Sequence, residues 1–443
     1  MVLHFYKAKR SILKSASLFL ACLCISASAY SQNSKSITFN LGDVLNSIGS
    51  TTQKNDDGTA SQGSGSTNQL IPRDIPNQWT PENALAIGSN HVLYLTKKGN
   101  VFAWGKNNLA QSGQGQFAGK NPVGDEIYRI PTEDINKPLR VPISDVIAVY
   151  AAGNSSFALK KDGSVWAWGN GKYSGLGSTN EYGNPVPTQV IGLPPIAKVA
   201  PWGQGAYAFA ADGTVWVWGQ GDQARMLQGS EFRTFQAGKP VRSRQGEPID
   251  VLAPNNDGKT TYVLARDGRV WNSEMKAPIA PLYFERLYGD AGYASGTYFG
   301  LTKDAKILMW KSGDLTRYSN KRAEHRIVQV EGVGSPINIA YEDDFIVFLQ
   351  KNGSLIVWGG EGALGRGNAV FLSKMESAAQ IPQIVNFSEK FATIKSYNFG
   401  ILAMTANGNL YMHNATNTDS VAMRKGRGRG SFTELLKPEQ LPE

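Results

Sequence analysis

The side chains that could catalyse a reaction or bind a metal are few in this 443-residue sequence, and they lie far apart. His91, His325 and His413 lack the short spacing of histidines that share a metal on one helix. A serine nucleophile needs a base and an orienting acid, and the sequence has no G-x-S-x-G motif to position one. We therefore predict no catalytic residue, no cofactor and no metal site. The sequence does not exclude a catalytic triad assembled from residues that are distant along the chain.

The elements that would position any functional residue form an internal repeat. Each copy has a short apolar strand, a tight turn and a second strand with bulky side chains two apart. The copies begin at His91, Ser156, Ala206, Thr261, Tyr298, Phe345 and Gly400. A repeat of this kind determines the architecture, and here it favours surface recognition over catalysis.

The turns of the repeat carry glycine in six copies out of seven. These glycines are Gly99, Gly163, Gly213, Gly268, Gly353 and Gly408. Asp-Gly and Asn-Gly pairs predict two-residue type I′ turns, in which both central residues have positive φ. Ala305 replaces the glycine in the fifth copy, so we expect strain or another turn type there, and the least regular hairpin.

The second strand of each copy is apolar on both faces. Tryptophans at equivalent positions are predicted to form the cores of the blades: Trp104, Trp168, Trp218, Trp271, Trp310 and Trp358. A strand that is apolar on both faces lies between two neighbouring sheets. The turns recur about every 50 residues, which suits one four-stranded sheet per repeat. The predicted fold is all-β, a seven-bladed β-propeller of four-stranded blades. Its ring is closed by pairing of the C-terminal strand, residues 432–436, with the first blade, which protects the edge strands.

Glycine-rich segments follow the tryptophans at residues 104–113, 168–177 and 358–365. With the strands before them, they resemble the repeat of the regulator of chromosome condensation superfamily, which implies a seven-bladed propeller. The chain resembles the secreted bacterial type, which includes the propeller-type β-lactamase inhibitor protein. The resemblance covers roughly residues 80–415. Function varies widely within this superfamily, so the fold alone implies no activity.

The N-terminal region is typical of an export signal. Lys7, Lys9, Arg10 and Lys14 precede a short apolar run, and Ala27-Ser28-Ala29 is typical of a cleavage site. We expect a signal peptide at 1–29, a flexible Ser/Gly/Asn-rich linker at 30–70 and the propeller at 71–443. The protein would be periplasmic, on the cell surface or extracellular, with no transmembrane segment in the mature chain. Because the signal holds four basic residues and no acidic one, the net charge of +9 becomes +5 after cleavage.

Aromatic residues expected in loops are the candidates for a binding face, because tyrosine and tryptophan dominate interface hot spots. They are Tyr128, Tyr173, Tyr182, Trp202, Phe232, Phe235, Tyr288 and Tyr293. The leading hypothesis is an exported, non-catalytic, monomeric propeller that binds a protein or, second, a cell-wall glycan through its loop faces. The basic run from Arg424 to Arg429 suits a solvated loop better than a nucleic-acid site.

Two other functions stay open from the sequence. Propellers also host enzymes that act on polysaccharides at the mouth of the central channel, which would need a convergent acid and base. The resemblance further implies guanine nucleotide exchange on a small GTPase, if the protein were delivered to host cells.

Overall fold

The structure is a computed structural model of the whole chain. It describes residues 73–120, 126–129, 134–170, 184–202, 205–219, 241–242, 250–252, 262–264, 268–272, 283–288, 297–311, 328–342, 345–359, 383–385, 387–397, 400–414 and 432–442. All of them belong to the second of two units, residues 59–443. The predicted signal peptide and linker, 1–29 and 30–70, lie outside the described residues.

The described chain is almost entirely antiparallel β-sheet. Sheet 1 contains β1 (Leu85–Ile87), β2 (His91–Leu95), β3 (Val101–Gly105) and β6 (Ile135–Arg140); sheet 2 contains β7 (Val146–Ala152), β8 (Ser155–Lys160), β9 (Val165–Gly169) and β10 (Asn184–Gln189). Sheet 3 contains β11 (Ile196–Trp202), β12 (Gly205–Ala210), β13 (Val215–Gly219) and β14 (Val241–Arg242); sheet 4 contains β15 (Asp250–Leu252), β16 (Tyr262–Leu264) and β17 (Val270–Asn272).

The second half of the chain repeats this arrangement. Sheet 5 contains β18 (Phe284–Tyr288), β19 (Thr297–Thr302), β20 (Ile307–Lys311) and β21 (Val328–Val330); sheet 6 contains β22 (Asn338–Glu342), β23 (Phe345–Leu349), β24 (Leu355–Gly359) and β25 (Gln383–Val385). Sheet 7 contains β26 (Phe391–Tyr397), β27 (Gly400–Thr405), β28 (Leu410–Asn414) and β29 (Phe432–Leu436). A separate ribbon pairs β4 (Gln116–Lys120) with β5 (Glu126–Arg129), and two short helices complete the described elements, α3 (Pro81–Ala84) and the 3-10 helix η2 (Pro438–Gln440).

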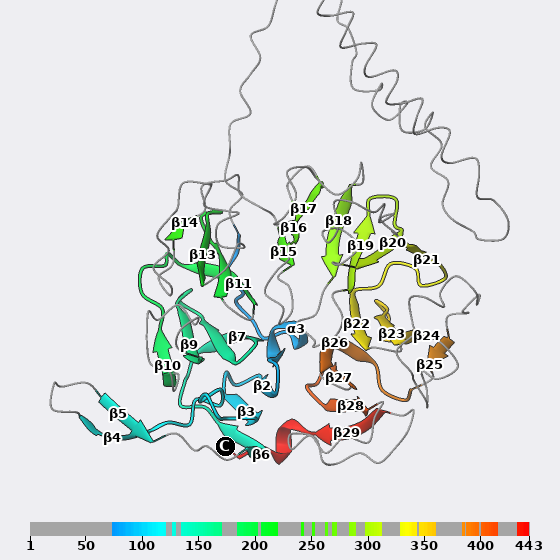
Figure 1. Cartoon of the computed structure of the whole chain (residues 1–443). Coiled ribbons are helices and arrows are strands. Elements are labelled where there is room, and N and C mark those ends of the chain that lie inside the picture. Colours follow the sequence, from blue (N-terminus) through cyan, green and yellow to red (C-terminus); the bar gives the residue numbers. More distant parts are fainter. Residues whose placement is uncertain are drawn as a thin grey trace, which may run out of the picture. The chain divides into compact units, whose positions relative to one another are not determined.

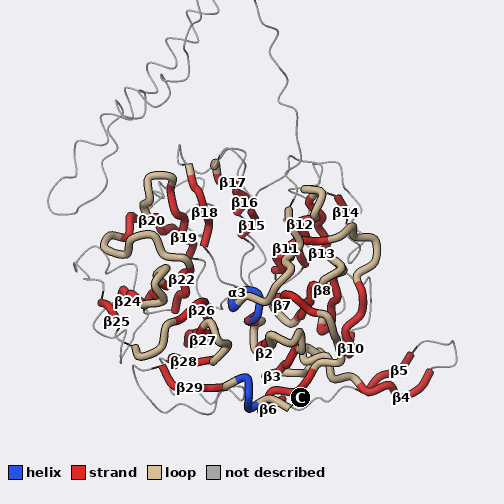
Figure 2. Tube along the Cα trace, turned by 180° about the vertical axis from the view of Figure 1, so that it is seen from behind, coloured by secondary structure: helices blue, strands red, loops and turns tan. Residues whose placement is uncertain are grey.

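The sheets surround α3 as the blades of a propeller, with the first strand of each sheet innermost (Figure 1). Inner strands of neighbouring sheets touch: β1 contacts β7 and β26, β7 contacts β11, β15 contacts β18, and β22 contacts β26. The contact between β1 and β26 joins the first sheet to the last. Figure 2 shows the same arrangement from behind, with the β4–β5 ribbon projecting from the rest of the unit.

The all-β propeller is thus confirmed, but the expectation of seven four-stranded blades is wrong. The described residues form six complete four-stranded blades, whereas sheet 4 has three strands of three residues each. The fourth repeat also departs from the others in sequence, because polar Asn272 and Ser273 follow Trp271 where most other copies continue with an apolar residue and a tryptophan. A strand buried between two sheets needs apolar residues on both faces, so this repeat is the least suited to a full blade.

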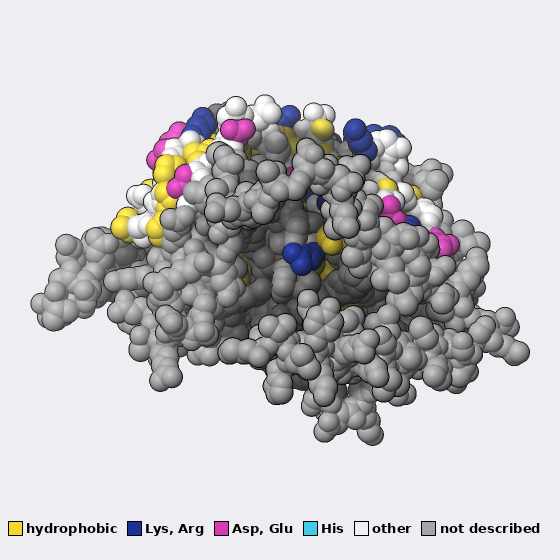
Figure 3. All heavy atoms as spheres, turned by 90° about the horizontal axis from the view of Figure 1, so that it is seen from above, with side chains coloured by type: hydrophobic (Ala, Val, Ile, Leu, Met, Phe, Trp, Pro, Cys, Tyr) yellow, Lys and Arg dark blue, Asp and Glu magenta, His cyan; other side chains and the backbone are white. Residues whose placement is uncertain are grey.

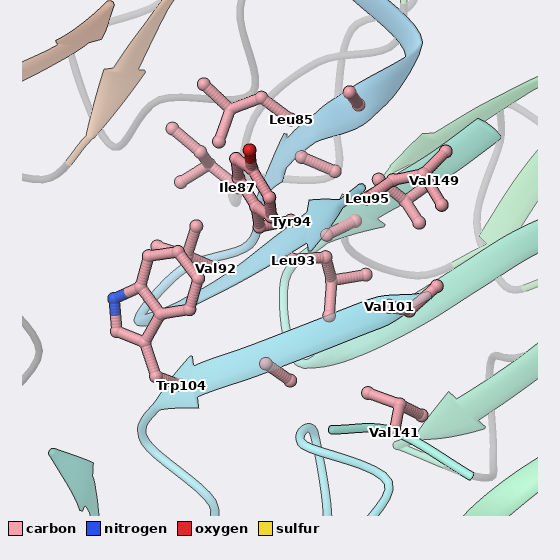
Figure 4. Close-up of a cluster of buried hydrophobic side chains, with 14 of the residues drawn as sticks. Leu85, Ile87, Val92, Leu93, Tyr94, Leu95, Val101, Trp104, Val141 and Val149 are labelled. Carbon is pink, nitrogen blue, oxygen red and sulfur yellow. The ribbon is translucent and has the colours of Figure 1, made fainter. Parts of the chain in front are cut away.

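The predicted ring closure is also wrong. The C-terminal strand β29 pairs with β28 of its own sheet, through Phe432–His413 and Leu436–Leu410, and not with the first sheet. Each described sheet is built from one continuous stretch of chain. Sheets 1 and 7 are instead joined by packing, because one apolar cluster contains Leu85 and Tyr94 of sheet 1 together with Leu402 and Met412 of sheet 7. Val149 enters this cluster from β7 of the next sheet (Figure 4).

The tryptophans predicted to form the blade cores are buried wherever their side chains are described. Trp104, Trp168, Trp218 and Trp310 expose 3% of their surface or less. The side chains of Trp271 and Trp358 lie outside the described part of the structure. Three further apolar clusters join sheets 2 and 3, sheets 5 and 6, and sheets 6 and 7. The burial of both faces of the strands, inferred from the sequence, is the physical basis of the propeller.

The hairpin turns contain positive-φ glycines as predicted, but they are not type I′ turns. Gly163 has φ +81°, whereas its neighbour Asp162 does not have a positive φ. The amide of Gly163 donates to the carbonyl of Lys160, and the amide of Lys160 donates to Ser164. This is the pattern of a three-residue loop, a type I turn followed by one left-handed residue. Ala305 keeps the same turn at φ +61°, so the replacement of glycine produces strain and not a different turn.

We expect Ala305→Gly to raise the free energy of unfolding by about 0.5–1 kcal/mol, because relief of the left-handed strain exceeds the added flexibility of the unfolded chain. Gly353→Ala is the matched control with the opposite sign. Its new Cβ would lie 2.9 Å from both Lys390 Cβ and the Phe391 carbonyl oxygen at a φ of +80°. Urea denaturation measures both variants. A loss of stability in Ala305→Gly would contradict the interpretation of the turn.

Candidate binding face

His91 is the most strongly perturbed ionisable group with a described environment. It is 1% exposed, and burial lowers its pKa to about 3. Its Nε2 lies 2.9 Å from Ser156 Oγ on the neighbouring sheet. The Ser156 hydroxyl donates its proton to the carbonyl of Gln111, at 2.8 Å, so Nε2 of His91 must donate to Ser156.

This histidine–serine pair is therefore not arranged for nucleophilic catalysis. A general base would need its lone pair directed at the serine proton, whereas His91 presents an N–H there. Its other nitrogen, Nδ1, has no hydrogen-bond partner among the described residues. A Cβ added at Gly88 would lie 2.5 Å from that nitrogen, so the backbone of Gly88 covers it. The pair instead holds two sheets together.

Trp168 is held by a hydrogen bond to the same carbonyl group of Gln111. Its indole N–H donates to the carbonyl of Gln111 at 2.8 Å, the same oxygen that accepts from Ser156. Gln111 belongs to the connection that follows β3, so the connection of sheet 1 seats the core tryptophan of sheet 2. A hydrogen bond shared between two blades also fixes how far apart they lie.

The other histidines supply no reactive group within the described structure. His413 is buried against Phe432, with ring centroids 5.3 Å apart, and burial lowers its pKa. His413 lies at the position of the repeat where other copies have a tryptophan such as Trp168. His325 lies outside the described residues. Among the residues that are described, no group of three or more His, Cys, Asp or Glu side chains is placed to hold a metal ion.

The propeller has two rims, and the strand order assigns every connection to one of them. The turn rim carries the tight turns at Gly99, Gly163, Gly213, Gly268, Ala305, Gly353 and Gly408. The loop rim lies at the opposite ends of the same strands. The longest connections all open there, after the third strand of a sheet, at 106–134, 170–183, 220–240, 312–327, 360–382 and 415–431.

The turn rim is partly covered by the chain itself. Residues 73–84, here named the strap, precede β1 and cross the turns of several sheets. The backbone of Arg73 donates to Ala211 next to the turn of sheet 3, and the indole of Trp79 donates to Leu95 before the turn of sheet 1. Sequence analysis missed the strap because it lies outside the repeat. An unassigned tryptophan, Trp79, was the signal that could have revealed it.

Two of the predicted contact residues belong to described strands at the loop rim. Trp202 is the last residue of β11, where the inner strand of sheet 3 reaches this rim. Tyr128 lies in β5 and pairs with Phe117 of β4, within the ribbon inserted after β3. The amide of Gly115 donates to Pro185 of β10, at 2.7 Å, so the base of the ribbon is attached to sheet 2.

Tyr288 is a correction, because it is not a loop residue. It is the last residue of β18, it is 5% exposed, and its hydroxyl donates to the Pro336 carbonyl at 2.6 Å. Burial raises its pKa. Its role is to join sheets 5 and 6. Five further candidates lie outside the described residues: Tyr173, Tyr182, Phe232, Phe235 and Tyr293. The basic run from Arg424 to Arg429 lies outside them as well.

The described surface gives no sign of a single-charge patch on the side seen in Figure 3. Basic, acidic and hydrophobic side chains are interspersed there among the described residues. Several cations instead lie over aromatic rings, as Lys160 does over Trp166 with its ammonium 4.2 Å from the ring centroid. No helix in the described part of the chain has the length and apolar character needed to cross a membrane.

Comparisons with known proteins agree with the repeat. Two models of the regulator of chromosome condensation (RCC1) repeat match the chain, one at residues 162–200 and the other at residues 83–114. The second match covers sheet 1 from β1 through β3 and the start of the connection that contains Gln111. The first runs from the turn of sheet 2 into the inner strand of sheet 3.

The chain is also similar to parts of longer proteins. RCC1 domain-containing protein RUG3, mitochondrial, of Arabidopsis thaliana is 28% identical over 131 residues, which are 29% of this chain and 27% of that protein. Probable E3 ubiquitin-protein ligase HERC6 of Homo sapiens is 28% identical over 190 residues, 42% of this chain and 18% of that protein. The chain thus spans less than a third of the length of these curated relatives.

Among solved structures, yeast RCC1 (Prp20) bound to Kap60 is similar at 17% identity and a TM-score of 0.43, covering 80% of this chain and 75% of that chain. Prp20p from Saccharomyces cerevisiae, described with its binding to Gsp1p and histones, is 16% identical with a TM-score of 0.43, covering 84% of this chain and 89% of that chain. The assignment of the repeat rests on the family models.

Proposed function

This chain belongs to the regulator of chromosome condensation repeat superfamily of β-propellers, and from that premise we propose that it is an exported, non-catalytic module that binds a protein partner at its loop rim. The observation that carries the proposal is the unequal use of the two rims. The strap lies across the turn rim, whereas the long connections open at the loop rim. Surface loops on a rigid scaffold are the usual position of binding residues.

The buried chemistry supports binding over catalysis. The histidine–serine pair is enclosed between two sheets, with its proton directed the wrong way for a general base. A binding surface needs no activated group, only side chains that a partner can cover. The strands that contain Trp202 and Tyr128 reach this rim, and both residues belong to the types that dominate interface hot spots.

Photo-crosslinking tests the proposed rim. A photoreactive residue is introduced at position 128, 202 or 283 of the full-length protein, which is produced in its own cells and irradiated. We expect discrete protein adducts from positions 128 and 202. Tyr283 is the control, because it is 52% exposed and lies beside the turn at Gly268, on the turn rim. Because we propose that the protein is exported, we also expect these adducts in the fractions outside the cytoplasm.

Two outcomes would contradict the proposal. Adducts from position 283 alone would move the binding surface to the turn rim. If none of the three positions gives a protein adduct while the protein co-sediments with purified cell-wall glycan, the partner is a glycan and not a protein.

A further inference from the structure

Three joints between neighbouring sheets share one backbone hydrogen bond at the turn rim. In each of them, the carbonyl of the turn glycine accepts from the first inner-strand residue of the next sheet. Ile196 donates to Gly163 at 2.9 Å, Phe284 to Gly268 at 2.6 Å, and Phe391 to Gly353 at 3.1 Å. These backbone bonds join sheets 2 and 3, sheets 4 and 5, and sheets 6 and 7.

The joint between the last and the first sheet uses a side-chain donor at the equivalent position. The carbonyl of Gly408, in the turn of sheet 7, accepts from the side-chain hydroxyl of Tyr94 at 2.9 Å. The inner strand β1 has only three residues, because α3 occupies the chain directly before it. A side chain of β2 has therefore replaced the backbone donor. Burial, with a smaller effect of the negative charge on Glu439, raises the pKa of Tyr94 to about 12.

Trp79 of the strap lies on this same joint. Its indole N–H donates to the carbonyl of Leu95 at 2.8 Å, which attaches it to sheet 1. A Cβ added at Gly408 would lie 3.8 Å from Trp79 Cζ2 and 2.8 Å from the Tyr94 hydroxyl, so the turn of sheet 7 packs against both rings. The ammonium of Lys97 lies 5.2 Å from the indole centroid. Trp79 thus bridges the two ends of the ring.

The rest of the strap is attached to other joints. Ile75 packs against the cluster shared by sheets 2 and 3, and a Cβ at Gly163 would lie 2.9 Å from its Cδ1. The guanidinium of Arg73 lies 4.4 Å from the ring centroid of Phe209 in sheet 3. At the other end, Glu82 of α3 reaches Arg286 of sheet 5, with a nitrogen–oxygen distance of 4.0 Å. The strap therefore contacts sheets 1, 2, 3, 5 and 7.

We propose that residues 73–84 are a clasp that holds the ring closed. The clasp takes over the task that strand exchange between the first and last blades would perform, which β29 does not perform here. Trp79 and Tyr94 lock the joint between sheets 7 and 1, and Ile75 and Arg73 brace the joint between sheets 2 and 3. Each of these side chains stabilises the joint that it contacts.

Hydrogen exchange of the full-length protein, measured by mass spectrometry, tests the clasp because it reports local opening. In Trp79→Ala, amide exchange should rise about tenfold or more in β1–β3 and β26–β28, with sheet 5 unchanged. In Ile75→Ala the increase should appear in β7–β13 instead. Tyr283→Ala, which removes an exposed aromatic side chain of the same rim, should change neither region.

A uniform rise across all sheets in both strap variants would show that the strap contributes only general stability, and would overturn the proposal. So would unchanged exchange at the joint of sheets 7 and 1 in Trp79→Ala. If Trp79→Ala does not fold, Tyr94→Phe removes only the hydroxyl bond to Gly408. It should raise exchange about threefold or more at that joint alone, and an unchanged rate there would again reject the clasp.

Discussion

Replacing Trp168 with alanine is expected to lower the free energy of unfolding by about 3–5 kcal/mol, which is the usual cost of removing a large buried aromatic side chain. Trp168 is fully buried at the joint of sheets 1 and 2, and its indole N–H donates to the Gln111 carbonyl at 2.8 Å. The variant loses the packing on both sheets and the hydrogen bond together. Urea denaturation followed by circular dichroism measures the change.

The chain provides a matched control two residues away on the same strand. Trp166 is only partly buried, and its indole donates to Ser164 within its own hairpin, at 3.1 Å. Lys160 lies over its ring. Because Trp166 makes its hydrogen bond inside one sheet, Trp166→Ala should cost about 1–2 kcal/mol, clearly less than Trp168→Ala. An equal or larger loss in Trp166→Ala would show that the joint between sheets does not depend on Trp168.

The features that the sequence predicted correctly are those that repeat. Trp168 was predicted to be a core residue because it recurs at the equivalent position of the copies, in strands whose two faces are both apolar. The glycines mark positions where φ is positive, as Gly163 and Gly408 show. The type of turn could not be decided, since Asp-Gly suits both a type I′ turn and a type I turn that ends in a left-handed glycine.

The features that the sequence did not predict occur once. Trp79 and Ile75 lie outside the repeat and have no periodicity, so nothing in the pattern revealed the strap. The apolar strand at 432–436 fits the outer edge of either sheet 7 or sheet 1, because the alternation of a strand does not specify its partner. Tyr288 was expected in a loop because it precedes the copy that begins at Tyr298, whereas the structure buries it at the end of β18, where it joins two sheets.

Lowering the pH from 7 to 5 is expected to destabilise the protein by about 2 kcal/mol through His91 alone. The pKa of this histidine is about 3 in the folded protein, against an ordinary value of 6.5. Between these two values the unfolded chain binds a proton that the folded protein excludes. The contribution of His91 to stability is therefore complete above about pH 6.5 and falls steadily as the pH drops towards 3.

The contribution of His91 is isolated by the pH dependence of the free energy of unfolding, and not by the free energy at a single pH. In His91→Gln the change in the free energy of unfolding between pH 7 and pH 5 should be about 2 kcal/mol smaller than in the unaltered protein, even if the variant is less stable at both values. His413→Gln is the companion variant, because burial lowers the pKa of His413 as well and its removal should reduce the same dependence. If His91→Gln leaves the dependence unchanged, His91 is not held neutral between sheets 1 and 2. The hydrogen-bonded pair with Ser156 would then have to open to water in the folded state, and the argument that this pair is enclosed and inert would fail with it.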